Sequence, residues 1–200
     1  MFSRSLLSKE TYKQDGEFCV LGSYAVAMKP FLNGTKQFDV QDFFKAYCDE
    51  MGCLCSSPKL TGAIGWERLY LSDFALRTST MSGYNLIRAL HENSTVSPFK
   101  EAGSKLAVQP CSLDQNGFPT IETALKNAAK RVVALACVNK VKIIPQTPSF
   151  ACVMPPHHSV VVGFEGTFFA YDVNHGQQLI ELGNTIQALA TADCLLFTEN

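Results

Sequence analysis

The sequence has 200 residues, of which 46% are hydrophobic and 18% charged, with a formal net charge of −1. This length makes one domain over residues 1–200 the default, and such a chain buries roughly 70% of its unfolded surface, enough for a core without disulfides or metal. The near-zero charge excludes the strongly basic character of most nucleic-acid-binding proteins, so we expect no nucleic-acid partner.

Apolar runs are short throughout the chain. None approaches the about 18 residues of a membrane span, and the N-terminal residues lack the apolar core of a secretory signal, so we expect a soluble chain with no membrane span and no Sec-type signal. The eight cysteines lie mostly inside apolar runs such as VVALACV and ADCLLF. Buried cysteine behaves as a small hydrophobe, so we expect free thiols and a reducing compartment.

The first part of the chain has helical periodicity. Helices are predicted over residues 17–29, ending near Pro30; over 40–51, with Asp39 as N-cap and Gly52 as C-cap; over one or two segments between 65 and 92; and over 120–130. The stretch 93–118 is interpreted as a long surface loop that joins this part to the next.

The last third is rich in short Val, Ile and Phe runs separated by Gly, Pro and Asn. Strands are predicted over residues 131–138, 150–154, 158–164, 167–173, 178–182 and 193–198. Helices followed by strands indicate an α+β fold with an antiparallel sheet, because hairpins need only short turns whereas parallel pairs need long crossovers.

The segment QDGEFCVLGSYAVAM places Cys19 at or just inside the N-terminus of the first predicted helix. Unpaired backbone N–H groups and the positive end of the helix dipole stabilise a thiolate there, and can lower a cysteine pKa from ~8.5 into a range of about 3.5 to 7.5. This position suits a nucleophile. For a lone cysteine in an apolar helix a core thiol is the favoured interpretation, so the partners of Cys19 must decide.

Two adjacent histidines supply candidate partners. In MPPHHSVVVGFEGTFFAYDVNHG, His157 and His158 stand at the entry to a Val-rich strand, and a hairpin turning at residues 165–166 returns Asp172 to the same end. A nucleophilic thiol needs a general base, and the base needs a third group that fixes its tautomer. The alternative is that the histidines cap a strand and that Asp172 is a turn residue.

The length of the hairpin loop determines which histidine shares a face with Asp172. A two-residue turn pairs Ser159 with Asp172 and puts His157 on the face of Asp172. A three-residue loop with Gly166 as the bulge residue shifts the pairing by one and selects His158.

The order Cys, His, Asp on a chain of helices followed by strands resembles the papain-like cysteine peptidase superfamily. FFAYDVNHG is similar to the aromatic strand end and Asp-x-Asn-x-Gly of the YopT/AvrPphB-type peptidases, which bacteria inject into host cells. DGEFCVLGSYAVAM is similar to the cysteine neighbourhood of those enzymes, of bacteriocin-leader peptidases and of effector glutamine deamidases. The chain departs from the YopT type in its doubled histidine and in Val173, where that type commonly has Pro.

The resemblance implies a papain-like domain in which Cys19 attacks a carbonyl, His157 or His158 carries the proton and Asp172 orients the imidazole. Gly163 stands six residues after His157, as a glycine often does after the histidine of papain-like enzymes, which favours His157. In the families named, an amide before the nucleophile helps the cysteine N–H to hold the oxyanion.

Gln14, five residues before Cys19, matches that amide, although a solvent-facing glutamine is the simpler interpretation of Gln14 alone. The resemblance further implies a host protein as substrate, no cofactor, and delivery into the host cytoplasm by a non-Sec route. A cysteine protease is the expected activity.

Three alternatives stay open at this point. A glutamine deamidase and a transglutaminase-type enzyme share the triad and its thioacyl intermediate with a protease, and the third alternative is a non-catalytic binding module with Cys19 in its core.

Cys48, Cys53 and Cys55 are crowded but contain no CxxC pair, so no metal is expected. His91, near a helix end, is interpreted as a cation that complements the helix dipole.

Overall fold

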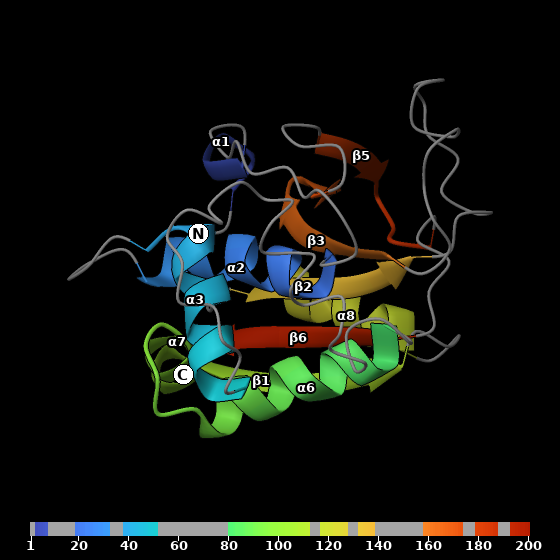
Figure 1. The fold of residues 1–200 in the computed structure, drawn as a ribbon. Coiled ribbons are helices and arrows are strands. Elements are labelled where there is room, and N and C mark those ends of the chain that lie inside the picture. The colour runs from blue at the N-terminus through green and yellow to red at the C-terminus, as the bar shows by residue number, and fades with distance from the viewer. Residues whose placement is uncertain are drawn as a thin grey trace.

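The computed structural model describes residues 3–7, 19–32, 38–51, 80–112, 117–127, 132–138, 158–173, 179–187 and 193–200. These residues form one sheet with helices packed on both of its faces (Figure 1). The helices are α1 Arg4–Leu7, α2 Cys19–Leu32, α3 Val40–Met51, α6 Thr80–Asn93, α7 Phe99–Lys105 and α8 Gly117–Lys126. None of these described helices is long and apolar enough to cross a membrane.

The sheet is antiparallel between every pair of neighbouring strands. Its strands are β1 Leu106–Ser112, β2 Val132–Val138, β3 His158–Glu165, β4 Thr167–Tyr171, β5 Leu179–Gly183 and β6 Asp193–Glu199, in the spatial order β1-β6-β2-β3-β4-β5. The predicted α+β class with an antiparallel sheet is therefore confirmed. The strand predicted over 150–154 lies outside the described residues.

The first helix was expected to end near Pro30, and this is wrong. Pro30 lies inside α2, which continues to Leu32. A proline inside a helix costs ~3 kcal/mol through the lost hydrogen bond and its ring clash. Phe31 and Leu32 are nevertheless buried at 6% and 2% exposure, and burying two such side chains stabilises the last turn by about 3–6 kcal/mol.

The helix predicted over 40–51 is confirmed, together with its cap. The Asp42 N–H donates to the Asp39 carboxylate at 3.0 Å, and the Asp39 N–H donates to the Asp42 carboxylate at 2.9 Å. This reciprocal pair satisfies backbone donors that the first turn of α3 leaves without helical partners. Gly52, the predicted C-cap, lies outside the described residues.

The predicted surface loop over 93–118 is also wrong, because α7, β1 and the start of α8 lie in it. Phe99 and Ala102 of α7 are fully buried, and β1 pairs with β6 along its whole length, from Leu106 opposite Glu199 to Ser112 opposite Asp193. One strand therefore precedes α8, and the chain does not divide cleanly into helices and then strands.

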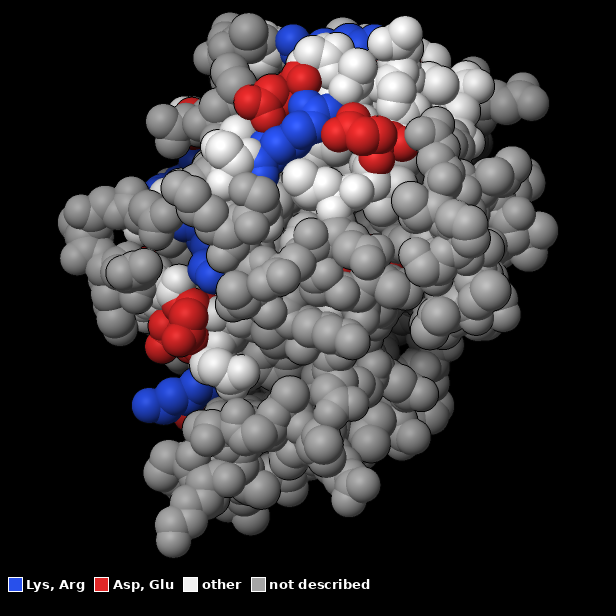
Figure 2. All heavy atoms as spheres, turned by 90° about the horizontal axis from the view of Figure 1, so that it is seen from above, with Lys and Arg blue, Asp and Glu red and all other residues white. Residues whose placement is uncertain are grey.

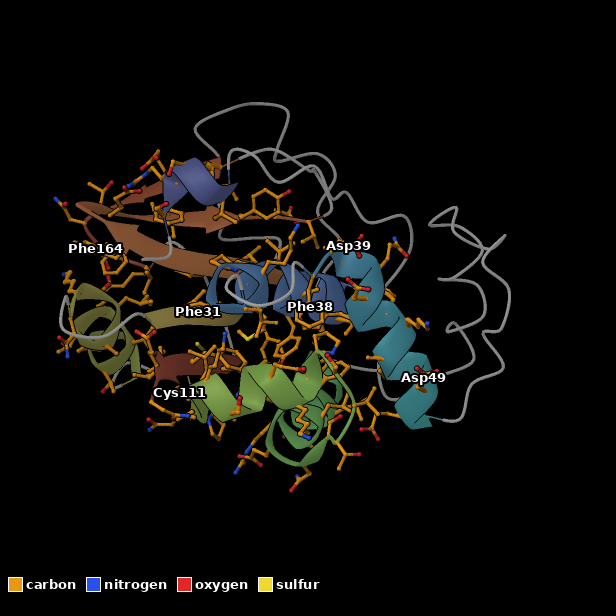
Figure 3. The ribbon with its side chains drawn as sticks, turned by 90° about the vertical axis from the view of Figure 1, so that its left-hand side faces the viewer. Phe31, Phe38, Asp39, Asp49, Cys111 and Phe164 are labelled. Carbon is orange, nitrogen blue, oxygen red and sulfur yellow. The ribbon has the colours of Figure 1, made fainter. Side chains whose placement is uncertain are left out.

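Two apolar cores lie on the two faces of the sheet. On one face α2, α3, α6 and α7 pack against Leu106 of β1 and against odd-numbered residues of the other strands, such as Val161 and Tyr171. On the other face α8 packs against even-numbered residues such as Val160 and Ala170. Phe31, labelled in Figure 3, belongs to the first core, so α2 is buried along most of its length between the sheet and the other helices.

Candidate active site

Cys19 is the first residue of α2, two positions after the predicted start. The backbone N–H groups of the first turn have no partner within the helix, and the helix dipole has its positive end there. Cys19 therefore has the backbone position that favours a thiolate. Its side chain lies outside what the structure describes, and so does Gln14.

The two histidines lie at the beginning of β3. His158 is the first residue of that strand, whereas His157 and the side chain of His158 lie outside the described part of the chain. The next residues, from Ser159 to Val162, are all buried. The end of β3 that follows the histidine pair is thus fixed inside the protein.

A buried hydrogen bond joins the beginning of α2 to the beginning of β3. The Ser23 hydroxyl donates to the carbonyl oxygen of Ser159 at 3.0 Å, and neither residue is exposed to solvent. Ser23 follows Cys19 by four residues, so the two share one side of α2 a single turn apart. Ser159 directly follows His158. The structure therefore brings α2, one turn after Cys19, against the residue that follows His158.

Asp172 directly follows the last residue of β4, Tyr171, and is completely buried. The predicted strand over 167–173 therefore ends two residues early. A carboxyl group without partners is far too costly to bury, so this position is not that of an ordinary turn residue in water. Asp172 enters the same region as the start of β3, because β3 and β4 are paired up to Val161 opposite Tyr171.

The β3–β4 hairpin has the three-residue loop. Phe164 pairs with Phe168 and Glu165 with Thr167, and Gly166 between them has a φ of 76°. Glycine adopts this left-handed conformation without the penalty that other residues incur. The two-residue turn is therefore wrong, and the register extended by one pair sets Val160 opposite Asp172. In this register His158, not His157, shares the face of Asp172.

Packing of α2 disfavours His158 as a partner of Cys19. The core that contains α2 includes Val161 and Tyr171, whereas Val160 belongs to the core that contains α8. Alternation along β3 therefore assigns position 158 to the α8 face, away from α2. Residue 157 lies outside the described residues, so the structure does not report its face.

Tyr84 is a buried polar neighbour of the site that the sequence did not reveal. Its hydroxyl forms a 2.9 Å hydrogen bond with the hydroxyl of Ser159, and Tyr84 is only 2% exposed. Tyr84 belongs to α6, so this bond attaches a third element to the beginning of β3. The only sequence signal is the spacing of Tyr84 and Ile87 on the apolar side of a helix, which predicts burial but no partner.

His91 is not the cation complementing the helix dipole that the sequence suggested. It is 3% exposed, its Nδ1 bonds the Tyr24 hydroxyl at 2.8 Å, and its Nε2 bonds the Leu106 carbonyl oxygen at 2.9 Å. A carbonyl can only accept, so Nε2 carries the proton and Nδ1 accepts from Tyr24. Burial lowers the pKa of His91, which therefore favours the neutral ring.

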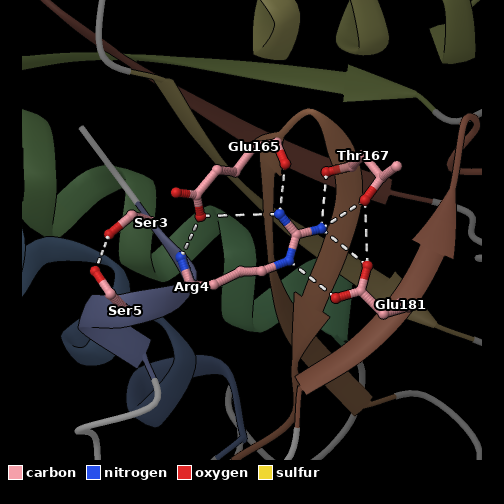
Figure 4. Close-up of polar contacts among 6 residues, drawn as sticks. All are labelled: Ser3, Arg4, Ser5, Glu165, Thr167 and Glu181. Atoms are coloured by element: carbon pink, nitrogen blue, oxygen red, sulfur yellow. Dashed lines mark hydrogen bonds and ion pairs between the residues drawn. The ribbon is translucent and has the colours of Figure 1, made fainter.

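Arg4 of α1 holds the β3–β4 hairpin and β5 together (Figure 4). Its guanidinium donates to the Glu165 carbonyl at 2.5 Å, to the Thr167 hydroxyl at 2.7 Å and to the Glu181 carboxylate at 2.8 and 2.9 Å, and lies 4.6 Å from the centre of the Phe169 ring. The hydrogen bond from Arg4 lowers the pKa of Glu181. On the face in Figure 2, the described basic and acidic side chains lie beside one another rather than in separate patches.

Two cysteines can be compared with the sequence prediction. Cys194 is a buried thiol, as expected, whereas Cys111 is only half-buried. The two are directly opposite each other on β6 and β1. Within the described ranges no three His, Cys, Asp or Glu side chains gather into a possible metal site, and Cys53 and Cys55 lie outside those ranges.

Comparisons of the chain with protein-family models, with curated proteins and with solved structures found no match.

Proposed function

We propose that this chain is a papain-like thiol hydrolase that acts on a host protein, with the activity of a cysteine protease. The observation that carries the proposal is the buried bond from Ser23 to Ser159, which holds α2, one turn after Cys19, against the first residues of β3. The helix start at Cys19 and the burial of Asp172 support the same assignment. The resemblance to injected bacterial peptidases supports a non-Sec route into the host cytoplasm.

The proposed reaction is acyl transfer through a thioester. The Cys19 thiolate attacks the substrate carbonyl carbon, and the C–N bond then breaks as the imidazolium gives its proton to the leaving amine. Water, deprotonated by the imidazole, hydrolyses the thioester and regenerates the thiol. Asp172 orients the imidazole, and the Cys19 N–H with the Gln14 amide stabilises the oxyanion.

Two histidines, His157 and His158, are candidates for the general base. The hairpin register favours His158 as the partner of Asp172, and the packing of α2 disfavours His158 as the partner of Cys19. Replacing each histidine by alanine separates the two, because one substitution should match Cys19→Ala and the other should leave turnover nearly unchanged.

The decisive experiment measures cysteine alkylation by iodoacetamide at about pH 6, below the free-thiol pKa of ~8.5. We expect one fast-reacting thiol, identified as Cys19 by peptide mass spectrometry and absent in Cys19→Ala. Incubation with a host-cell extract then identifies the reaction: new peptide termini indicate a protease, a glutamine converted to glutamate a deamidase, and an amine cross-link a transglutaminase. Slow and uniform alkylation of all cysteines would exclude the thiol hydrolase.

A non-catalytic binding module is the second candidate. One observation favours it. The β3–β4 register places position 158 and Asp172 on the face of the sheet that packs against α8, which is the opposite face from α2 and Cys19. In that case Cys19 is a core thiol, and Cys19→Ala leaves the biological effect of the protein intact.

A further inference from the structure

Two buried hydrogen bonds that meet at Ser159 join three elements into one polar network. Ser23 of α2 donates to the Ser159 carbonyl of β3 at 3.0 Å, and the Ser159 hydroxyl bonds the Tyr84 hydroxyl of α6 at 2.9 Å. Ser23 and Ser159 are 0% exposed and Tyr84 is 2% exposed. Apart from His91 and Asp172, these two serines are the buried polar or charged residues of the described chain.

This network fixes Ser159 through two different groups. The carbonyl of Ser159 is held by α2 and its side chain by α6, so both the backbone and the side chain directly after His158 are restrained. A buried hydroxyl without its partner loses more free energy than an apolar replacement would, so the three groups remain together. Without these two hydrogen bonds, the backbone at the beginning of β3 would have more conformational freedom than the middle of the strand.

The position of this network matters for the proposed chemistry. Its Ser23 end lies one helical turn after Cys19, and its Ser159 end lies one residue after His158. A misplacement of about 1 Å between reacting groups can reduce a rate by roughly a hundredfold, and such groups stay in place only where neighbouring residues restrain them. The restraint here acts on residues close in sequence to both members of the proposed thiol–imidazole pair.

We infer that Ser23, Ser159 and Tyr84 are positioning residues that set the geometry between the Cys19 thiolate and its histidine base. The inference rests on the proposed function of Cys19. It adds that α6 takes part in the site through Tyr84, although α6 supplies no residue of the triad.

Tyr84→Phe and Tyr24→Phe provide a matched pair for the test. Both remove one hydroxyl from a fully buried tyrosine, and both hydroxyls bond a side chain of another element. Tyr84 bonds Ser159 of β3, whereas Tyr24 bonds His91 of α6. Ser23→Ala is the second test variant, because it removes the other bond of the network with almost no change in volume.

The experiment measures the rate of Cys19 alkylation against pH in the full chain, with denaturant midpoints for every variant. We expect Tyr84→Phe and Ser23→Ala to reduce the rate at about pH 6 by roughly ten- to a hundredfold and to move the profile toward that of a free thiol. Tyr24→Phe should lose comparable stability and retain the wild-type profile.

Two outcomes overturn the positioning role while the proposed function stands: a wild-type profile in both Ser23→Ala and Tyr84→Phe, or an equal loss of rate in Tyr24→Phe. If wild-type Cys19 does not react fast at all, the proposed function fails, and the positioning role fails with it. If Tyr84→Phe does not fold, Ser23→Ala alone decides, since it leaves the packing of α6 unchanged.

Discussion

Replacing His91 by phenylalanine removes the two buried hydrogen bonds through which His91 joins α6 to α2 and β1, and it keeps an aromatic ring in the same place. Phenylalanine retains an aromatic ring, which packs here 5.1 Å from Phe197 and 5.9 Å from Tyr24 between ring centres. It has no nitrogen, so the Tyr24 hydroxyl and the Leu106 carbonyl lose their partners. Each buried polar group left without a partner costs about 1–3 kcal/mol, so His91→Phe should destabilise the protein by about 2–5 kcal/mol.

The stability difference should also depend on pH, because burial lowers the pKa of His91. Above the unfolded-state pKa of ~6.5 both states hold a neutral ring, and the full contribution of the two hydrogen bonds is present. As pH falls below that value, the unfolded chain gains a proton that the buried ring resists. The contribution of His91 therefore decreases with falling pH until the lowered folded-state pKa is reached.

Urea denaturation of wild type and His91→Phe between about pH 5 and 8 measures both effects. The other histidines titrate in both proteins, so the difference between the two free energies of unfolding reports on His91. We expect a difference that is largest near pH 8 and smaller near pH 5. A difference that stays constant over this range, or a variant as stable as wild type, would refute the neutral buried ring.

Three further substitutions test other parts of the fold. Arg4→Lys keeps the charge but not the planar fork of donors, and we expect a loss of about 1–2 kcal/mol in urea denaturation that shrinks at high salt. Gly103→Ala should be the most damaging of the three, because a Cβ there would overlap the backbone carbonyl oxygen of His91 and force α7 away from α6; a wild-type thermal midpoint would contradict that close approach. Asp39→Ala breaks the reciprocal cap with Asp42, and calorimetry should show a loss of about 1 kcal/mol, with no loss expected if the cap contributes nothing.

Local signals predicted the parts of the fold that depend on neighbouring residues. The α3 cap could be recognised because Asp39 stands directly before the helix, and its partner Asp42 lies only one helical turn away in the sequence. By contrast, β1 is an edge strand that contains Pro110, a residue that normally ends a strand prediction. Its strand partner is β6, more than 80 residues further on, and no local pattern reports that partner.

The candidate site also contains features that local sequence predicts and features that depend on distant partners. The position of Cys19 at a helix start follows from a local change in polarity, and it could be predicted within two residues. The hairpin loop could not be fixed, because a Glu-Gly pair suits both two- and three-residue loops and only the observed pairing separates them. Ser23 and Ser159 are 136 residues apart, and a serine in an apolar helix carries no signal of such a partner.

The conflict between His157 and His158 can be traced to the ends of two strands. The side chains of β4 alternate between the two faces of the sheet up to Tyr171. Tyr171 and Val173, on either side of Asp172, both lie in the core beside α2. If the pleat continued through Asp172, that carboxyl group would stand with position 158 on the α8 face, and Cys19 would have no base there. A triad therefore requires the backbone to leave the pleat at one of these ends, between Tyr171 and Val173 or before Ser159. The Ser23 and Tyr84 bonds hold Ser159 on the α2 face, so a departure at the start of β3 would cost both bonds, and the proposed triad places the departure between Tyr171 and Val173.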